Sequence, residues 1–150
     1  MNDIVKMSIK DINEIYAFES LCFPEGYTSM EIWTELLDDE RTSVYAIKDK
    51  NELIAFASTY NWKGQHDYIK IMCLATHIDY RQMGNASRLM QHIIDESLKE
   101  GMYIFKAETR ESNRKMQNVF NRFGYELAQR VEGYYDNPKE TAYKYALFCQ

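Results

Sequence analysis

The sequence contains no run of lysines and arginines that would form a basic surface. Its 18 Lys and Arg residues are outnumbered by 23 Asp and Glu residues, which gives a formal net charge of -5 at pH 7. Because nucleic acids are bound through clustered positive charge, this composition argues against nucleic acid as the main ligand. An acidic chain suits a cationic substrate such as an amine or a basic peptide, although net charge alone decides little.

Cysteine is scarce, and its spacing excludes the usual uses of cysteine. Cys22, Cys73 and Cys149 form no C-x-x-C pair and have no metal-ligand spacing with the histidines. A disulfide framework and a zinc site are therefore both disfavoured, and no metal is expected. We expect three reduced cysteines that fill apolar space in a reducing compartment.

Long apolar segments are also missing. No stretch approaches 18 consecutive apolar residues, so the sequence predicts no membrane-spanning helix. Residues 1–6 lack the basic start and the apolar run of a signal peptide. We therefore expect a cytoplasmic protein whose partners include neither a membrane nor a nucleic acid.

The composition that remains is that of a globular protein. Of the 150 residues, 45% are hydrophobic and 27% are charged, which is enough to bury a core without disulfides or metals. The sequence shows no linker, internal repeat or low-complexity stretch. We therefore expect a single domain over residues 1–150.

The hydrophobic period changes along the chain between that of a strand and that of a helix. Strand patterns cover 4–8, 43–48, 52–62, 68–76, 103–109, 125–131 and 141–149, and helix patterns cover 10–22, a segment capped by Thr28 or Ser29, 86–98, and a segment capped by Ser112 that ends at Gly124. The predicted order is β-α-α-β-β-β-α-β-α-β-β. This order indicates an α+β domain of three layers, in which helices flank a mixed, mostly antiparallel sheet.

A strand, a glycine-bearing loop and a helix follow one another around Gly84. The first N–H groups of a helix have no partner inside it, and the helix dipole is positive there, so a pyrophosphate can bind. Gly84 and Ala86 keep side chains away from such a ligand, while Arg81 and Arg88 add positive charge. Taken alone, R-x-x-G-x-A also fits an ordinary turn glycine. Its position between a strand and an amphipathic helix favours the phosphate site.

Three segments together carry a recognisable pattern. Arg81, Gly84 and Ala86 form R-x-x-G-x-A, residues 108–113 form E-x-R-x-S-N, and residues 120–125 form an aromatic residue followed by x-x-x-G-Y. The sequence resembles the GNAT superfamily of acetyl-CoA-dependent N-acetyltransferases, which has these motifs in this order. The resemblance spans the whole chain and implies a GNAT-type fold and an acyltransferase activity.

Within this superfamily the sequence is most similar to the ribosomal-protein alanine N-acetyltransferases and their relatives. Those proteins also have a Tyr-Tyr pair before a proline-bearing loop, which Tyr134 and Tyr135 before Pro138 match. The Cys-Phe-Pro at residues 22–24, followed by a helix, is similar too. Ile78 is a minor departure, because the family usually has proline at this position.

The resemblance implies acetyl-CoA as the co-substrate. Main-chain groups of Leu74, Ala75 and Thr76 would pair with its pantetheine arm, and Asn113 would bond the pantetheine end. The residues implied to hold the pyrophosphate are Arg81, Gln82, Met83, Gly84, Asn85, Ala86 and Ser87. From the sequence alone, strand burial explains the first three residues equally well, and Asn is common in the first turn of a helix.

The resemblance assigns Glu108 the role of general base. A base is needed because an amine of pKa about 8 to 10 is mostly protonated, and so not nucleophilic, at neutral pH. Glu108 lies in an apolar strand pattern, where a carboxylate is not an obvious surface charge. The alternative is a carboxylate at a strand end that faces water or pairs with Arg110 or Arg114. The residues alone leave both possibilities open.

Aromatic residues are the candidates for the acceptor groove. Tyr134 and Tyr135 are expected in a loop between strands, where the resemblance implies that their hydroxyls bond a peptide backbone. Phe23 and Tyr27 are candidates for the opposite wall. Trp33 has the pattern of a core residue.

Phe120 departs from the family. Relatives of the alanine acetyltransferase type have a tyrosine there, which protonates the leaving coenzyme A thiolate, and phenylalanine cannot do so. We expect direct transfer of the acetyl group from acetyl-CoA to a primary amine, with a protein or peptide N-terminus favoured. The alternatives are a small amine acceptor (a polyamine, amino acid or aminoglycoside) and a non-catalytic acetyl-CoA-binding module.

Overall fold

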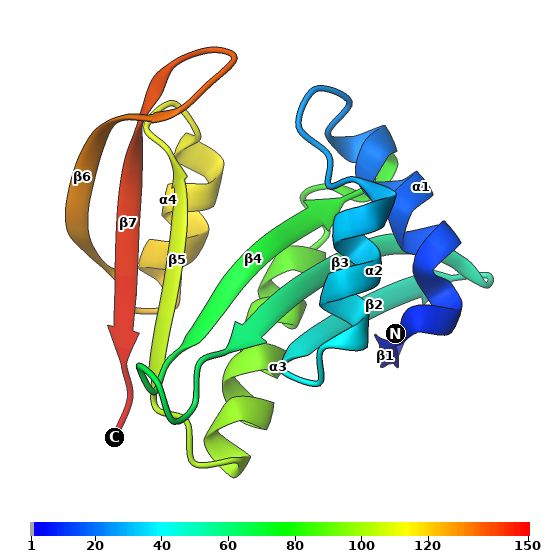
Figure 1. The fold of residues 1–150 in the computed structure, drawn as a ribbon, viewed down its shortest axis with the longest axis horizontal. Coiled ribbons are helices and arrows are strands. Elements are labelled where there is room, and N and C mark those ends of the chain that lie inside the picture. The colour runs from blue at the N-terminus through cyan, green and yellow to red at the C-terminus, as the bar shows by residue number, and fades with distance from the viewer. Residues whose placement is uncertain (1) are drawn as a thin grey trace. The chain divides into compact units, whose positions relative to one another are not determined.

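The structure is a computed structural model and describes residues 2–150 (Figure 1). The elements are β1 (Ile4–Met7), η1 (Ile9–Asp11), α1 (Ile12–Cys22), α2 (Met30–Asp38), β2 (Thr42–Asp49), β3 (Glu52–Asn61), β4 (Ile69–Thr76), η2 (Ile78–Tyr80), α3 (Asn85–Lys99), β5 (Ile104–Arg110), α4 (Arg114–Arg122), β6 (Glu126–Tyr135) and β7 (Glu140–Phe148). Leaving aside the two short 3-10 turns, this is the predicted order of strands and helices, which is confirmed. Among the described residues, no helix has the length and apolar character needed to cross a membrane.

The seven strands follow the order β1-β2-β3-β4-β5-β7-β6. β1 with β2, β2 with β3, β5 with β7 and β6 with β7 pair antiparallel, whereas β4 with β5 pairs parallel. The predicted mixed, mostly antiparallel sheet flanked by helices is therefore confirmed.

The chain divides into two compact units. Unit 1 comprises the described residues up to Tyr60 together with Met72–His92, and unit 2 comprises Asn61–Ile71 and Ile93–Gln150. Strand β4 and helix α3 each contribute residues to both units. The single domain over residues 1–150 stays a prediction.

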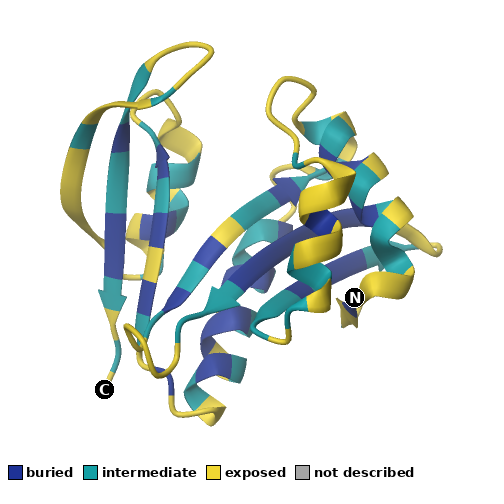
Figure 2. Cartoon of the chain, viewed as in Figure 1, coloured by how far each residue is buried: buried dark blue, intermediate teal, exposed yellow. Residues whose placement is uncertain are grey.

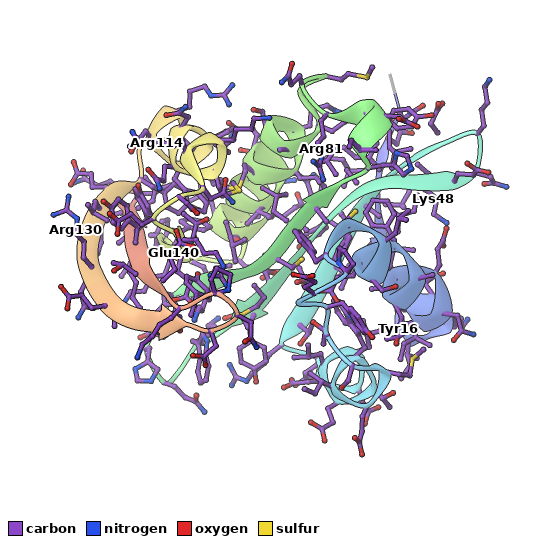
Figure 3. All side chains as sticks on the ribbon, turned by 90° about the horizontal axis from the view of Figure 1, so that it is seen from above. Tyr16, Lys48, Arg81, Arg114, Arg130 and Glu140 are labelled. Carbon is purple, nitrogen blue, oxygen red and sulfur yellow. The ribbon has the colours of Figure 1, made fainter. Side chains whose placement is uncertain are left out.

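Unit 1 is built around a well-packed aromatic core. Helices α1 and α2 lie over one face of β2 and β3, and the first half of α3 lies over the other face (Figures 1 and 3). Phe18 and Trp33 each pack their rings against Phe56, with centroids 5.9 and 6.0 Å apart. Trp33 is 1% exposed, so its predicted place in the core is confirmed.

A buried carboxylate joins the two helices of this layer. Glu19 on α1 is 4% exposed and accepts three hydrogen bonds. The donors are the Thr28 N–H at 2.7 Å, the Thr28 hydroxyl at 3.0 Å and the Trp33 indole N–H at 3.0 Å. Buried charges are tolerated where such donors satisfy them, so Glu19 fixes the connection between α1 and α2. The sequence pattern did not predict this network.

In unit 2, the strand period separates a packed face from a charged one. Phe105, Ala107 and Thr109 of β5 are buried, and the residues between them are more exposed (Figure 2). Helix α4 packs against the buried face, where the Phe120 ring lies 5.1 Å from that of Tyr145. The opposite face carries the side chains between the buried ones.

We call that opposite face the charged face and define it by Lys70, Lys106, Glu108 and Lys144. Lys70 is the register partner of Lys106 across β4 and β5, and Glu108 is the partner of Lys144 across β5 and β7. Directly paired residues project to the same side of a sheet. Strand pairing therefore gathers these four side chains on one surface.

The N-terminus of α4 differs from the prediction. The helix begins at Arg114, and its N-cap is Asn113 rather than Ser112, because Asn113 Oδ1 accepts the Met116 N–H at 3.1 Å. The Ser112 N–H donates instead to a Glu140 carboxylate oxygen at 2.7 Å. Both residue types cap helices well, so the sequence did not distinguish them.

The tyrosine pair also lies elsewhere than predicted. β6 runs to Tyr135, whereas the sequence pattern predicted a strand that ends at Val131, so Tyr134 and Tyr135 lie on a strand and not in a loop. Pairing with β7 resumes at Tyr135 opposite Glu140 after a register shift. An irregularity of this kind breaks the alternation from which a strand is recognised in sequence.

We predict that Glu19→Ala lowers the free energy of unfolding by about 3 kcal/mol, because it leaves buried donors without an acceptor. Urea denaturation followed by circular dichroism measures the effect. The control is Glu14→Ala, which removes a partly exposed ion pair with Lys48 (3.1 Å) and should cost less than about 1 kcal/mol. Equal losses in the two variants would contradict the structural role of Glu19.

Candidate active site

The loop that leads into α3 has the backbone of an anion site. Gln82 and Gly84 have positive φ angles of 65° and 81°, and the first hydrogen bond of the helical turn runs from the Arg88 N–H to the Gly84 carbonyl at 3.0 Å. The N–H groups of Asn85, Ala86 and Ser87 precede that bond. They therefore have no helical carbonyl to bond and form the positive end of the helix.

Side chains fix this loop from behind. Asn85 is 8% exposed and donates from Nδ2 to the Tyr80 carbonyl at 3.2 Å. Arg81 donates from Nε to the Thr76 carbonyl at 3.1 Å, which ties the loop to the end of β4 (Figure 3). Arg88 donates to the Asn2 carbonyl. These contacts preorganise the loop and leave its N–H groups for a ligand.

The loop fits the pyrophosphate of coenzyme A. No atom lies within 4 Å of the position that a Cβ on Gly84 would take, so the backbone there is open to a ligand. Leu74, Ala75 and Thr76 form the last residues of β4, directly before η2 and the loop. Within unit 1 the structure thus brings together all the predicted cofactor residues except Asn113, which belongs to unit 2.

Glu108 lies at the centre of the charged face of unit 2. Its side chain is 19% exposed, and Oε1 accepts the Tyr134 hydroxyl at 2.9 Å. The Lys70 Nζ lies 3.5 Å from Oε1 and the Lys144 Nζ lies 3.5 Å from Oε2. The carboxylate is therefore neither a freely solvated charge nor a partner of Arg110 or Arg114.

Arg110 has a different carboxylate partner. Its Nη1 lies 3.2 Å from Glu140 Oε1, and the guanidinium also donates to the carbonyls of Asp136 and Pro138. Hydrogen bonding from Ser112 is the main reason that the pKa of Glu140 lies below its ordinary value, and Arg110 adds to the effect. This cluster pins the turn between β6 and β7 to the end of β5.

The tyrosine pair borders Glu108. The rings of Tyr134 and Tyr135 meet edge to face with centroids 5.2 Å apart. The hydrogen bond to Glu108 is the main reason that the pKa of Tyr134 lies above its ordinary value. Burial, followed by the charge of Glu108, raises the pKa of Tyr135 to about 12. Both phenols therefore keep their protons at neutral pH.

The other candidate acceptor residues belong to unit 1. Phe23 and Tyr27 follow α1 and are 38% and 44% exposed. Tyr27 packs edge to face against Tyr16, with ring centroids 5.7 Å apart. Their exposure leaves aromatic surface for a ligand, and their place in one wall of an acceptor groove stays a prediction.

Cys73 precedes Leu74 on β4 but does not have the chemistry of a nucleophile. Burial is the main reason that the pKa of its thiol is raised well above the ordinary range, and the charge of Glu19 raises it further. A thiol of this kind stays protonated at neutral pH and does not attack a thioester. Its surroundings suit the predicted role of filler.

Lys70 and Lys144 are the residues near Glu108 that the sequence did not single out. Each lies inside a strand, where lysine is uncommon. This unusual position was the only sequence feature that could have marked them as functional residues. The interactions that make them relevant depend on strand register. Among residues 2–150, no group of three or more His, Cys, Asp or Glu side chains is arranged to hold a metal ion.

A strand, a glycine-bearing loop and a helix start whose N–H groups are open to a pyrophosphate fit a protein that binds a phosphate-bearing cofactor such as coenzyme A. Residues 12–125 match the Acetyltransferase (GNAT) family, and the chain belongs to this family. The predicted activity, transfer of an acetyl group from acetyl-CoA to an amine, is thereby confirmed at the level of the family.

Solved structures have the same fold. The ribosomal-protein-S18-alanine N-acetyltransferase from Escherichia coli is 24% identical, with a TM-score of 0.89 over 100% of this chain and 95% of that one. Arabidopsis thaliana NAA60 in complex with acetyl-CoA is 16% identical (TM-score 0.86, 99% and 98% covered). Ard1 from Thermoplasma volcanium is 19% identical (TM-score 0.84, 99% and 98% covered). A search of curated proteins found no significant match.

We predict that Gly84→Val abolishes the rise in melting temperature that acetyl-CoA produces. A ligand at 100 times its dissociation constant stabilises the fold by about 2.7 kcal/mol, and a β-branched side chain at Gly84 would fill the open space before the loop. Differential scanning fluorimetry with and without acetyl-CoA measures the effect.

Gly64→Val is the matched control. Gly64 also has a positive φ, 85°, and no atom lies within 4 Å of the position that its Cβ would take, but it lies in the turn after β3. Both substitutions should cost about 1 to 2 kcal/mol of stability through backbone strain. Only Gly84→Val should also lose the response to acetyl-CoA. A retained response in that variant would contradict the assignment of the loop.

Proposed function

We propose that the protein acetylates the N-terminus of a protein or peptide by direct transfer, with Glu108 as the general base. The observation that carries this proposal is the environment of Glu108, a half-buried carboxylate hydrogen-bonded by Tyr134 at 2.9 Å. A base of this kind must be held still and must lie within reach of solvent and substrate. The fold shared with an alanine N-acetyltransferase of ribosomal protein S18 supports the choice of acceptor.

The cofactor residues hold and orient acetyl-CoA, which supplies the activated acetyl group. The N–H groups from Gln82 to Ser87 bind the pyrophosphate, with the dipole of α3 behind them. Main-chain groups of Leu74 to Thr76 bond the pantetheine arm, and a main-chain N–H near Ala75 stabilises the developing oxyanion. Asn113 uses Oδ1 to cap α4, so its Nδ2 is the group that donates to the pantetheine end.

Glu108 accepts the proton of the acceptor ammonium, directly or through a water molecule. The hydrogen bond from Tyr134 fixes the position of Oε1, and Lys144 lies on the side of Oε2. Tyr135 has its ring against the guanidinium of Arg110, 4.6 Å from centroid to Cζ, so both tyrosines are held in place. Their hydroxyls are the groups that bond the backbone of the acceptor peptide.

Release of the thiolate has no obvious acid. Phe120 is 2% exposed and packs against the rings of Tyr125 and Tyr145, and its side chain has no proton to give. The Tyr134 hydroxyl already donates its hydrogen bond to Glu108, and its raised pKa makes it a weaker acid. A thiol of pKa about 8.5 leaves without help at neutral to alkaline pH. We therefore expect a slow enzyme.

Glu108→Gln should lower kcat by roughly 10² to 10⁴ and leave the affinity for acetyl-CoA nearly unchanged, because the amide cannot accept the proton. Initial rates of coenzyme A release with a peptide acceptor measure kcat, and calorimetry measures binding of acetyl-CoA. The control is Glu126→Gln, a substitution of an exposed carboxylate at the start of β6, which should leave both quantities unchanged. An equal loss of cofactor binding in Glu108→Gln would make Glu108 a structural residue.

Phe120→Tyr should raise kcat, because the added hydroxyl can protonate the departing sulfur of coenzyme A. The gain should be largest below pH about 8.5, where the thiol is more stable than the thiolate. The pH profile of kcat for the two proteins measures the effect. Phe120→Leu is the control, since it changes the packing without adding a hydroxyl. An unchanged profile in Phe120→Tyr would mean that another group, such as a tyrosine of the pair, already supplies the proton.

A protein that binds acetyl-CoA but acetylates neither peptides nor small amines in any of these forms would be a non-catalytic module. A screen of peptides, polyamines, amino acids and aminoglycosides separates the acceptor classes. The cytoplasmic location stays a prediction from the sequence.

A further inference from the structure

The charged face of unit 2 carries an excess of positive charge around the proposed base. Its four defining side chains are three ammonium groups and one carboxylate. Lys70 and Lys144 share the single carboxylate of Glu108, each at 3.5 Å. Among the described residues, Lys106 has no carboxylate within 4.0 Å. These four side chains together carry a net positive charge, although the chain as a whole carries a net charge of -5.

The lysines are held in place rather than extended into solvent. The Lys106 Nζ lies 4.5 Å from the centre of the Tyr68 ring, and the Lys144 Nζ lies 4.4 Å from the centre of the Tyr134 ring. Such cation–π contacts fix an ammonium group, and at Lys106 the charge is left without a carboxylate counterion in the described part of the chain. Lys70 and Lys106 are also direct register partners. Like charges that face each other on neighbouring strands repel, and an anion bound between them would relieve this repulsion.

We infer that the acceptor carries an acidic side chain at its second or third residue, next to the amine that it presents to Glu108. This inference rests on the proposed function, since it requires a peptide acceptor at Glu108. An acceptor that brought only positive charge would be repelled by Lys70, Lys106 and Lys144. A neighbouring carboxylate converts that repulsion into attraction and fixes the direction in which the peptide lies.

The spacing of the strand suits such an acceptor. Lys106 and Glu108 lie two residues apart on β5, and residues at that spacing are about 7 Å apart on one face. An extended peptide advances by about 3.3 to 3.6 Å per residue. With its amine at Glu108, its second or third side chain can therefore reach Lys106 or Lys70.

The same cations also assist the chemistry. A positive charge close to an ammonium group lowers the pKa of that group, because it destabilises the protonated form. Lys70 and Lys144 would thus favour the neutral, nucleophilic form of the acceptor amine. A polyamine gains nothing from this face, because its further ammonium groups are repelled.

Three peptides that differ only at residues two and three test the inference: Ala-Glu-Glu, Ala-Gln-Gln and Ala-Lys-Lys, each followed by the same neutral tail. We expect kcat/KM to fall in that order, with about a tenfold difference between the acidic and the neutral peptide at low salt. The difference should shrink at high salt, because ions screen exposed charges. Glutamate as a free amino acid is the fourth acceptor.

Variants assign the effect to this face. Lys106→Gln should reduce the preference for the acidic peptide to about threefold or less. The control is Lys115→Gln, on the exposed surface of α4, which should leave the preference unchanged. Circular dichroism melting checks that both variants are folded.

The outcomes separate the two proposals. Equal kcat/KM for the three peptides, or an unaltered preference in Lys106→Gln, would overturn the inference and leave the proposed function standing. Faster acetylation of glutamate than of the acidic peptide would overturn the peptide acceptor and the inference with it. No acetylation of any peptide by protein that still binds acetyl-CoA would overturn the proposed function itself.

Discussion

The position of Glu108 between two ammonium groups and a phenol is the interaction on which the proposed chemistry of this protein depends. β4 supplies Lys70, β7 supplies Lys144, and the end of β6 supplies Tyr134, so three strands converge on one carboxylate of β5. Each contact requires the sheet to pair in one register, because a slip by one residue would turn the side chains to the other face. The buried face that α4 covers enforces that register.

The proposed cofactor site depends on more local contacts. The loop before α3 offers N–H groups at a helix start, and its conformation is set by the positive φ of Gln82 and Gly84 and by the bond from Asn85 to the Tyr80 carbonyl. All of these residues are close in sequence. β4 connects this loop to the charged face along a single strand, since it begins with Ile69 and Lys70 and ends at Thr76.

Features that arise from neighbouring residues were predictable, and those that arise from pairing or capping geometry were not. The strand and helix order, the loop around Gly84 and the core position of Trp33 follow from period and composition over a few residues. The cap at Asn113 was missed because Ser112 is an equally good candidate. The strand position of Tyr134 was missed because an irregularity interrupts the alternation of β6.

The sequence by itself determined the fold class, the family and the glycine-bearing loop before α3, because these depend on patterns among residues that are close together in the chain. The tertiary structure alone decided the electrostatics around Glu108. Tyr134 and Glu108 are 26 residues apart in the chain, and Lys70 and Lys144 belong to different strands on either side of β5. A net charge of -5 gives no sign of a cationic surface, because composition averages over the charges that strand pairing brings together.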